Sequence, residues 1–311
     1  MTVLLRAVLN FGDCCITFVA DSPTRIPPSS GRWRSELRKI EQEKKTPEGF
    51  NRYLFEVDML RFVRERLHFS PDTKQTELLR GNIHRVLLNC TRQWGKSTIT
   101  AAIALHRAWT RPASMTIVVS PSARQSGEFL RKANLFAKKL GIRARGDGDN
   151  PISLLLPNDS RVVGLPGSEA TVRGFSSVSL MVIDEAARVT DELYKAVRPF
   201  LAASDGDLML MSTPWGKRGF FYEEWVNGGA RWQRFKVPAT ACPRIRPEFL
   251  QEERHALGEK WFSQEYLCEF SDVGGTLFSR DVINRAFSDD VKPLFPVGEG
   301  FSPRPPAILK S

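Results

Sequence analysis

Several features are missing from this sequence. No uncharged apolar run approaches about 18 residues, so no membrane-spanning helix is predicted. The five cysteines are odd in number and include no Cys-x-x-Cys pair, which argues against a disulfide framework or a zinc site and suits a reducing cytosol. Arg6 and Asp13 interrupt the apolar N-terminus, so no secretory signal is predicted. Internal repeats and coiled-coil heptads are also absent.

What remains is ordinary for a soluble globular protein. The 311 residues are 41% hydrophobic and 26% charged, and the length suits about two domains. We expect a partly flexible N-terminal extension over 1–50, a core over 51–240, a small helical subdomain over 241–275, and a C-terminal linker or tail over 276–311.

Acidic residues are nearly missing from one stretch. Residues 85–146 contain 12 Lys and Arg but only one acid, Glu128, whereas the balance is +3 before this stretch and −4 after it. A clustered basic face is typical of a protein that binds a polyanion. A basic surface that only meets solvent is the alternative.

Short apolar runs alternate with helical patterns in the middle of the chain. Continuous apolar strands between helices predict a mainly parallel sheet covered on both faces, which is an α/β fold. A turn at Pro157-Asn158-Asp159 predicts a hairpin. The expected strands are Arg85–Asn89, Thr116–Ser120, Ile152–Leu156, Arg161–Leu165, Leu180–Ile183 and Leu208–Met211, and the expected helices are Lys96–Trp109, 122–140 and most of 241–270.

The segment CTRQWGKS, residues 90–97, follows a predicted strand and precedes a predicted helix. It matches the phosphate-loop (Walker A) pattern G-x-x-x-x-G-K-[ST], except that Cys90 replaces the first glycine. Backbone N–H groups of such a loop surround phosphates, while Lys96 reaches the β- and γ-phosphates and Ser97 binds Mg²⁺. A coincidental turn before a helix is the alternative. The expected nucleotide-binding residues here are Thr91, Arg92, Gln93, Trp94, Gly95, Lys96, Ser97 and Thr98.

Two acids end the apolar run LMVIDE. Ligands bind at the carboxyl ends of strands in open α/β sheets, so Asp184 is expected to hold Mg²⁺ and Glu185 to act as general base. A solvated turn is the alternative. A later run, LMLMSTP, ends at Ser212 and Thr213, whose hydroxyls could sense hydrolysis beside a γ-phosphate.

These motifs together resemble the ATPase domain of the terminase large subunit, the motor that packages DNA into phage capsids. The resemblance covers about Phe69 to Phe270. It rests on FSPDTKQTELL, TRQWGKST, TIVVSPSARQSGEF, LPGSEATVRGF, LMVIDEAARV, LMLMSTPWGKRGFFYEEW and FSQEYLCEF, in the family's order. It implies a phosphate-loop NTPase of the RecA or ASCE type with a small helical lid, using ATP and Mg²⁺ in the host cytoplasm. The implied partners are double-stranded DNA, a portal protein, a small terminase subunit and further copies in a ring.

The resemblance also implies individual roles. Gln75 corresponds to a glutamine that recognises adenine, and Arg92 to an arginine close to the phosphates. Arg173 corresponds to an arginine that acts on a neighbouring subunit's nucleotide or on DNA. Ser212 and Thr213 correspond to a motif that couples hydrolysis to movement.

One departure concerns the nuclease domain that usually follows in this family. Only five acids follow Phe270 within about forty residues, so we expect no DNA cleavage by this chain. Two rival functions remain. A helicase-like ATPase would usually need a second RecA-like lobe. A degenerate remnant would bind ATP or DNA only as an assembly component.

Overall fold

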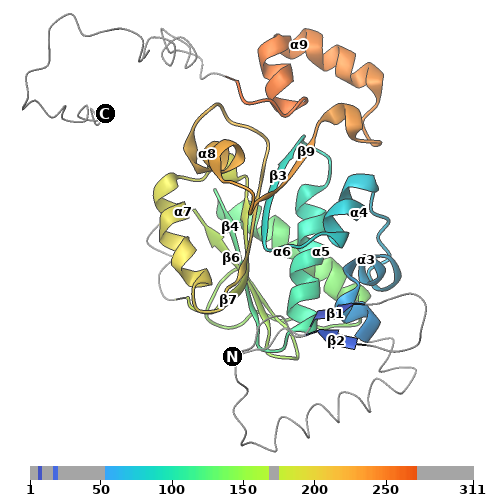
Figure 1. The fold of residues 1–311 in the computed structure, drawn as a ribbon, viewed down its shortest axis with the longest axis vertical. Helices are drawn as coiled ribbons and strands as arrows, with labels where there is room; N and C mark the ends of the chain where they lie inside the picture. Colours follow the sequence, from blue (N-terminus) through green and yellow to red (C-terminus); the bar gives the residue numbers. More distant parts are fainter. Residues whose placement is uncertain (1–5, 9–16, 20–52, 168–174, 272–311) are drawn as a thin grey trace, which may run out of the picture. The chain divides into compact units, whose positions relative to one another are not determined.

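The computed structural model describes residues 6–8, 17–19, 53–167 and 175–271 (Figure 1). The chain divides into two units, Met1–Val57 and Asp58–Ser311. In the first unit, β1 (Arg6–Val8) and β2 (Thr17–Val19) form an antiparallel pair. Apart from this pair, the expected extension over 1–50 lies outside the described residues, as does the expected tail over 276–311.

The second unit is built on a seven-stranded sheet. Its order is β5-β6-β4-β7-β8-β3-β9, and every pair is parallel except β5 with β6. The strands are β3 (Arg85–Cys90), β4 (Met115–Ser120), β5 (Ser153–Leu155), β6 (Arg161–Pro166), β7 (Val178–Asp184), β8 (Asp207–Ser212) and β9 (Gln233–Val237). This confirms the predicted α/β fold, including the hairpin of β5 and β6.

Helices cover both faces of this sheet, as Figure 1 shows. One face packs on α7 and α8 through a core that includes Ile183, Leu210 and Phe221. The opposite face packs on α5, where the Thr100 hydroxyl contacts the Met211 sulfur at 3.2 Å. The described helices are α3 (Met59–Arg61), the π-helix η1 (Phe62–Arg66), α4 (Thr73–Arg80), α5 (Lys96–Thr110), α6 (Ala123–Lys139), α7 (Asp191–Val197), α8 (Gly219–Asn227) and α9 (Pro247–Glu265), with 3-10 turns at Ala186–Arg188, Arg198–Leu201 and Ala239–Ala241. No helix in these described ranges has both the length and the apolar character needed to cross a lipid bilayer.

Two elements differ from the sequence-based expectation. Strand β9 was not predicted, because its residues QRFKV mix polar and apolar side chains rather than forming an apolar run. The helical segment expected over 241–270 is α9, which begins only at Pro247 and is interrupted at Gly258, where φ is +73°. Proline suits the first turn of a helix, and glycine tolerates the left-handed backbone.

Gly206 packs too closely to accept a side chain. A Cβ atom there would lie 2.0 Å from the Val178 carbonyl oxygen and 2.8 Å from Leu201 Cδ2. We expect Gly206→Ala to lower the free energy of unfolding by about 3 kcal/mol, because backbone must move to relieve the overlap. Urea unfolding measures this change. Gly127→Ala is the control: no described neighbour lies within 4 Å of its Cβ position in α6, so it should stabilise the protein by up to about 1 kcal/mol. Equal effects of the two substitutions would contradict this account of the packing.

Candidate active site

The loop between β3 and α5 turns sharply before the helix begins. Gln93 has a φ of +66° and Gly95 a φ of +89°, both in the left-handed region. Helix α5 starts at Lys96, and no described side chain caps its first turn. Thr98 lies in this first turn, and its N–H bonds back to the Gly95 carbonyl at 3.0 Å. This is the strand, loop and helix arrangement that the phosphate-loop pattern predicted, and uncapped helix N–H groups favour an anion.

Sheet order brings the loop and the two acids together. Strand β3 carries the loop, β7 carries Asp184 at its end, and β8 lies between them. The Lys96 Nζ lies 3.2 Å from Glu185 Oε1, and the Ser97 hydroxyl lies 3.5 Å from Asp184 Oδ2. The Lys96 side chain is only 9% exposed. Four residues chosen from two separate motifs therefore meet at the carboxyl edge of the sheet.

The environment of Asp184 disfavours its charge. Burial, with the neighbouring negative charge of Glu185 as a second cause, raises the pKa of Asp184 to about 6. The positive charge of Lys96 opposes this shift. Glu185 itself has a left-handed backbone with φ of +50°, and its N–H donates to Asp184 Oδ1 at 2.9 Å. A non-glycine residue in this conformation is a local strain of the kind often found at functional sites.

This burial predicts that Asp184 destabilises the ligand-free protein when ionised. The pKa is raised on folding, so the protonated carboxyl favours folding below about pH 4 and that contribution is lost as the pH rises through about 6. We expect Asp184→Asn to raise the unfolding free energy at pH 8 by roughly 1–3 kcal/mol. The gain should vanish near pH 4. Chemical unfolding of both proteins at the two pH values measures it, and a gain that is equal at both would contradict this explanation.

The donors at this position suit a magnesium ion. Ser97 offers a hydroxyl and Asp184 a carboxylate, and oxygen ligands of this kind are those that Mg²⁺ prefers. The described part of the chain holds no group of three or more His, Cys, Asp or Glu that could enclose a metal. Mg²⁺ usually keeps several waters and binds substrate phosphates as well, so a small protein ligand set fits it.

Gln75 contacts the loop from α4. Its Nε2 donates to the Trp94 carbonyl at 3.1 Å, and its Oε1 accepts from the Asp72 N–H at 3.1 Å. The Asp72 carboxylate in turn caps the helix by accepting from the Gln75 N–H at 2.9 Å. Arg244 reaches the same place, contacting the Trp94 carbonyl and lying 3.3 Å from Asp72 Oδ2. Sequence reasoning did not find Arg244, since no motif marks the segment before α9.

Arg92 turns towards α9. Its Nε donates to Glu265 Oε2 at 2.7 Å, and Arg188 lies 3.8 Å from the other oxygen of that carboxylate. The Thr91 hydroxyl also donates to the Glu265 carbonyl at 3.0 Å. Glu265 therefore joins the end of α9 directly to the phosphate loop. Its position in a charged helix gave no sequence signal for this contact.

The proposed coupling residues lie between the loop and the acids. Ser212 ends β8, opposite Asn89 of β3, and its buried hydroxyl has no hydrogen-bond partner among the described residues. Thr213 is also buried. A buried hydroxyl without a hydrogen-bond partner destabilises the folded state. Such a hydroxyl suits a group that gains a partner in another state. Arg173 lies outside the described residues.

Comparison with known proteins places this chain in a family. The family model for the terminase large subunit, T4likevirus-type, N-terminal, matches residues 87–285. The terminase large subunit of Thermus virus P23-45 is 24% identical over an alignment of 251 residues that covers 69% of this chain and 52% of that protein. The terminase large subunit of Escherichia phage T5 is 24% identical over 220 residues, covering 68% of this chain and 49% of that protein. The chain thus spans about half the length of the curated relatives it matches.

Solved structures show the same fold. The large terminase ATPase domain of Thermus phage P74-26 has a TM-score of 0.58 at 23% identity, covering 67% of this chain and 96% of that one. The HK97 bacteriophage large terminase also has a TM-score of 0.58, at 15% identity, covering 69% of this chain and 55% of that one. Because the family model matches more than half of its length, the chain belongs to the family of terminase large subunits of the T4-like virus type, matching their N-terminal part.

Proposed function

We propose that this chain is a Mg²⁺-dependent ATPase that couples ATP hydrolysis to movement of double-stranded DNA into a viral capsid. The observation that carries this proposal is the meeting of Lys96 and Ser97 from the loop with Asp184 and Glu185 from β7. Family membership supports it, and a relative, the large terminase of a thermophilic bacteriophage, has been solved in complex with ADP.

The contacts of these residues suggest how they would act. In the structure, Lys96 is paired with Glu185. An arriving γ-phosphate would draw the Lys96 ammonium away and leave the Glu185 carboxylate free to orient water and accept its proton. Attack by that water on the γ-phosphorus breaks the bond to the β-phosphate oxygen. Bound Mg²⁺, held by Ser97 and Asp184, would supply charge neutralisation.

Glu265 and Ser212 supply a route from the nucleotide to the rest of the domain. Phosphates bound in the loop would compete with the Glu265 carboxylate for Arg92, which would loosen the link to α9. Ser212 and Thr213 lie at the end of β8 and would respond to loss of the γ-phosphate. Gln75, Arg92, Gln93 and Trp94 complete the proposed nucleotide site.

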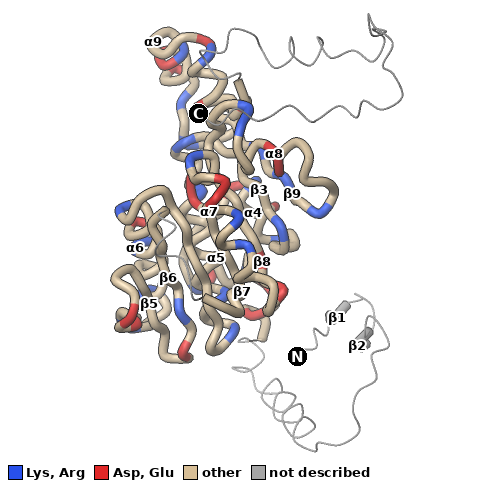
Figure 2. The backbone as a smooth tube through the Cα atoms, turned by 90° about the vertical axis from the view of Figure 1, so that its left-hand side faces the viewer, with Lys and Arg blue, Asp and Glu red and all other residues tan. Residues whose placement is uncertain are grey.

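The proposed DNA contact is narrower than the basic stretch 85–146. Several of its charges already form ion pairs within the chain: Arg92 pairs with Glu265, Lys96 with Glu185 and Arg107 with Asp207. Apart from Arg111 at the end of α5, the exposed cations that remain lie on or after α6, and Figure 2 shows Lys and Arg positions along this helix. They include Arg124, Lys138, Arg143 and Arg145. A portal protein, a small terminase subunit and a ring of copies are further partners that membership of this family suggests.

Salt dependence tests the DNA contact. Linear duplex DNA should bind more weakly as salt rises, because phosphate contacts release counterions. A triple variant with Arg124, Lys138 and Arg143 each replaced by alanine should bind more weakly, with a salt slope shallower by about three. Arg231→Ala, an exposed site outside this stretch, is the matched control. Filter binding over a salt series measures the DNA affinity and its salt slope. An unchanged slope in the triple variant would rule out α6 as the DNA contact.

A further inference from the structure

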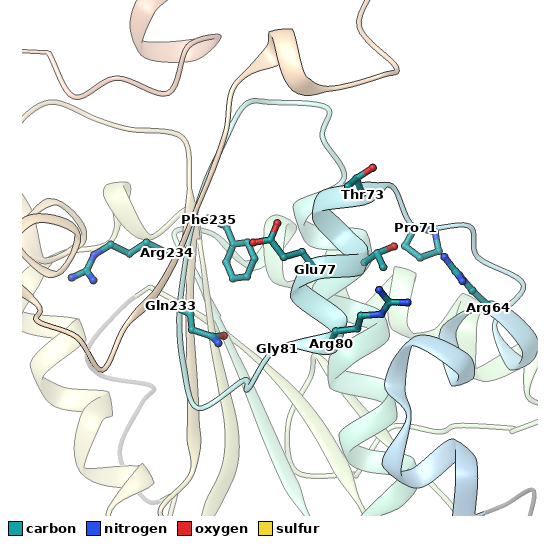
Figure 3. A pocket seen from close by; sticks show the side chains of 10 residues that line it. Arg64, Pro71, Thr73, Glu77, Arg80, Gly81, Gln233, Arg234 and Phe235 are labelled. Carbon is teal, nitrogen blue, oxygen red and sulfur yellow. The ribbon is translucent and has the colours of Figure 1, made fainter. Parts of the chain in front are cut away.

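A pocket lies outside the phosphate loop, between α4 and β9 (Figure 3). Its volume is about 870 Å³, and none of the residues that line it belongs to the proposed nucleotide site. Arg64 of η1 and Arg80 of α4 lie on its α4 side, as Figure 3 shows, and Phe235 faces them from β9. The pocket therefore carries guanidinium groups on one side and the Phe235 ring on the other, with the carboxylate of Glu77 next to the ring.

Positive charges outnumber negative charges around this pocket. Each nearby carboxylate already has a cation: Glu77 pairs with Lys74 at 2.7 Å, Glu65 with Arg61 at 2.9 Å, and Asp72 with Arg244 at 3.3 Å.

Arg64 and Arg80, by contrast, are exposed and have no hydrogen-bond or ion-pair partner among the described residues. A third arginine of the lining is different, since Arg234 points away from the pocket and donates to the carbonyls of Glu224 and Trp225. The pocket thus carries two guanidinium groups that are available to an anionic ligand.

We propose that this pocket binds an acidic, extended peptide segment of a partner protein. Carboxylates match the planar donor fork of arginine. The concave lining, with Phe235 and Pro71, suits side chains that enter a hollow, whereas a rigid duplex presents a convex row of phosphates. Strand β9 is the last of the sheet and pairs only with β3 among the described strands, so an extended segment could also run beside it.

The test uses the full chain and a fluorescein-labelled 12-residue peptide of alternating aspartate and valine, followed by fluorescence anisotropy. The parent chain should bind this peptide in preference to one of alternating lysine and valine. Replacing Arg64 and Arg80 together by alanine should weaken binding roughly tenfold. Arg231 lies outside the pocket lining, so Arg231→Ala should leave the binding of both peptides unchanged.

Charge reversal makes the test sharper. A variant carrying Arg64→Glu and Arg80→Glu should prefer the lysine peptide, provided that its thermal unfolding matches the parent. Equal binding of both peptides by the parent, or unchanged binding in the double alanine variant, would overturn the proposal. So would a double alanine variant that loses duplex DNA binding but keeps the acidic peptide, because the pocket would then be a nucleic-acid surface. ATP turnover plays no part in these readouts.

Discussion

Replacing Glu185 by glutamine is expected to reduce ATP turnover by about 10²–10⁴-fold while ATP remains bound. Glutamine has nearly the same shape but cannot accept a proton from water. The substitution also removes the partner that holds Lys96 at 3.2 Å, so the ammonium is free to meet phosphate. The dissociation constant for ATP should therefore stay equal or fall. Single-turnover hydrolysis and equilibrium binding of the same protein measure the two quantities separately.

The control for this variant is Glu192→Gln. Glu192 is an exposed carboxylate in the first turn of α7, so its replacement should leave turnover unchanged. If turnover persisted in Glu185→Gln, another group would have to take the proton. If both ATP binding and turnover were lost, Glu185 would be needed for the shape of the site rather than for the chemistry.

Replacing Lys96 by alanine is expected to weaken ATP binding as well as turnover. Its buried ammonium is the cation that would lie against the β- and γ-phosphates, and its loss leaves phosphate charge uncompensated in a site with little solvent. We expect turnover to fall by about 10²–10³-fold and ATP binding to weaken as well. Isothermal titration with ATP and a steady-state assay check the two effects.

Lys195→Ala provides the matched control, because Lys195 is an exposed lysine in α7. Tight ATP binding in Lys96→Ala would mean that the loop does not hold the phosphates. Together, the Glu185 and Lys96 variants separate a residue that acts on the attacking water from one that acts on the nucleotide.

Much of the sheet could be predicted from the sequence, because its central strands are buried on both faces. Strands β4, β7 and β8 begin and end within two residues of the expected apolar runs. That signal is strong because no polar residue interrupts it. Strand β9 gave no such signal, since it lies at the edge and carries Arg234 and Lys236.

The central site was predictable for a related reason. The loop and the acid pair each sit at the end of an apolar strand, and parallel strands bring their carboxyl ends to one edge of the sheet. Arg244 and Glu265 could not be found in this way. Each reaches the loop from a segment more than 140 residues later, and only the packing of α9 and its preceding turn determines those contacts. The sequence likewise did not indicate that Arg92 forms an ion pair with Glu265.

The central claim is that Lys96, Ser97, Asp184 and Glu185 form a working ATPase site. Steady-state ATP hydrolysis by the purified chain tests it most directly, with and without Mg²⁺ and linear duplex DNA, beside Lys96→Ala. The account predicts turnover that requires Mg²⁺, rises with DNA, and is lost in the variant. An equal rate in the parent chain and in Lys96→Ala, or a parent chain that neither binds nor hydrolyses ATP, would contradict it.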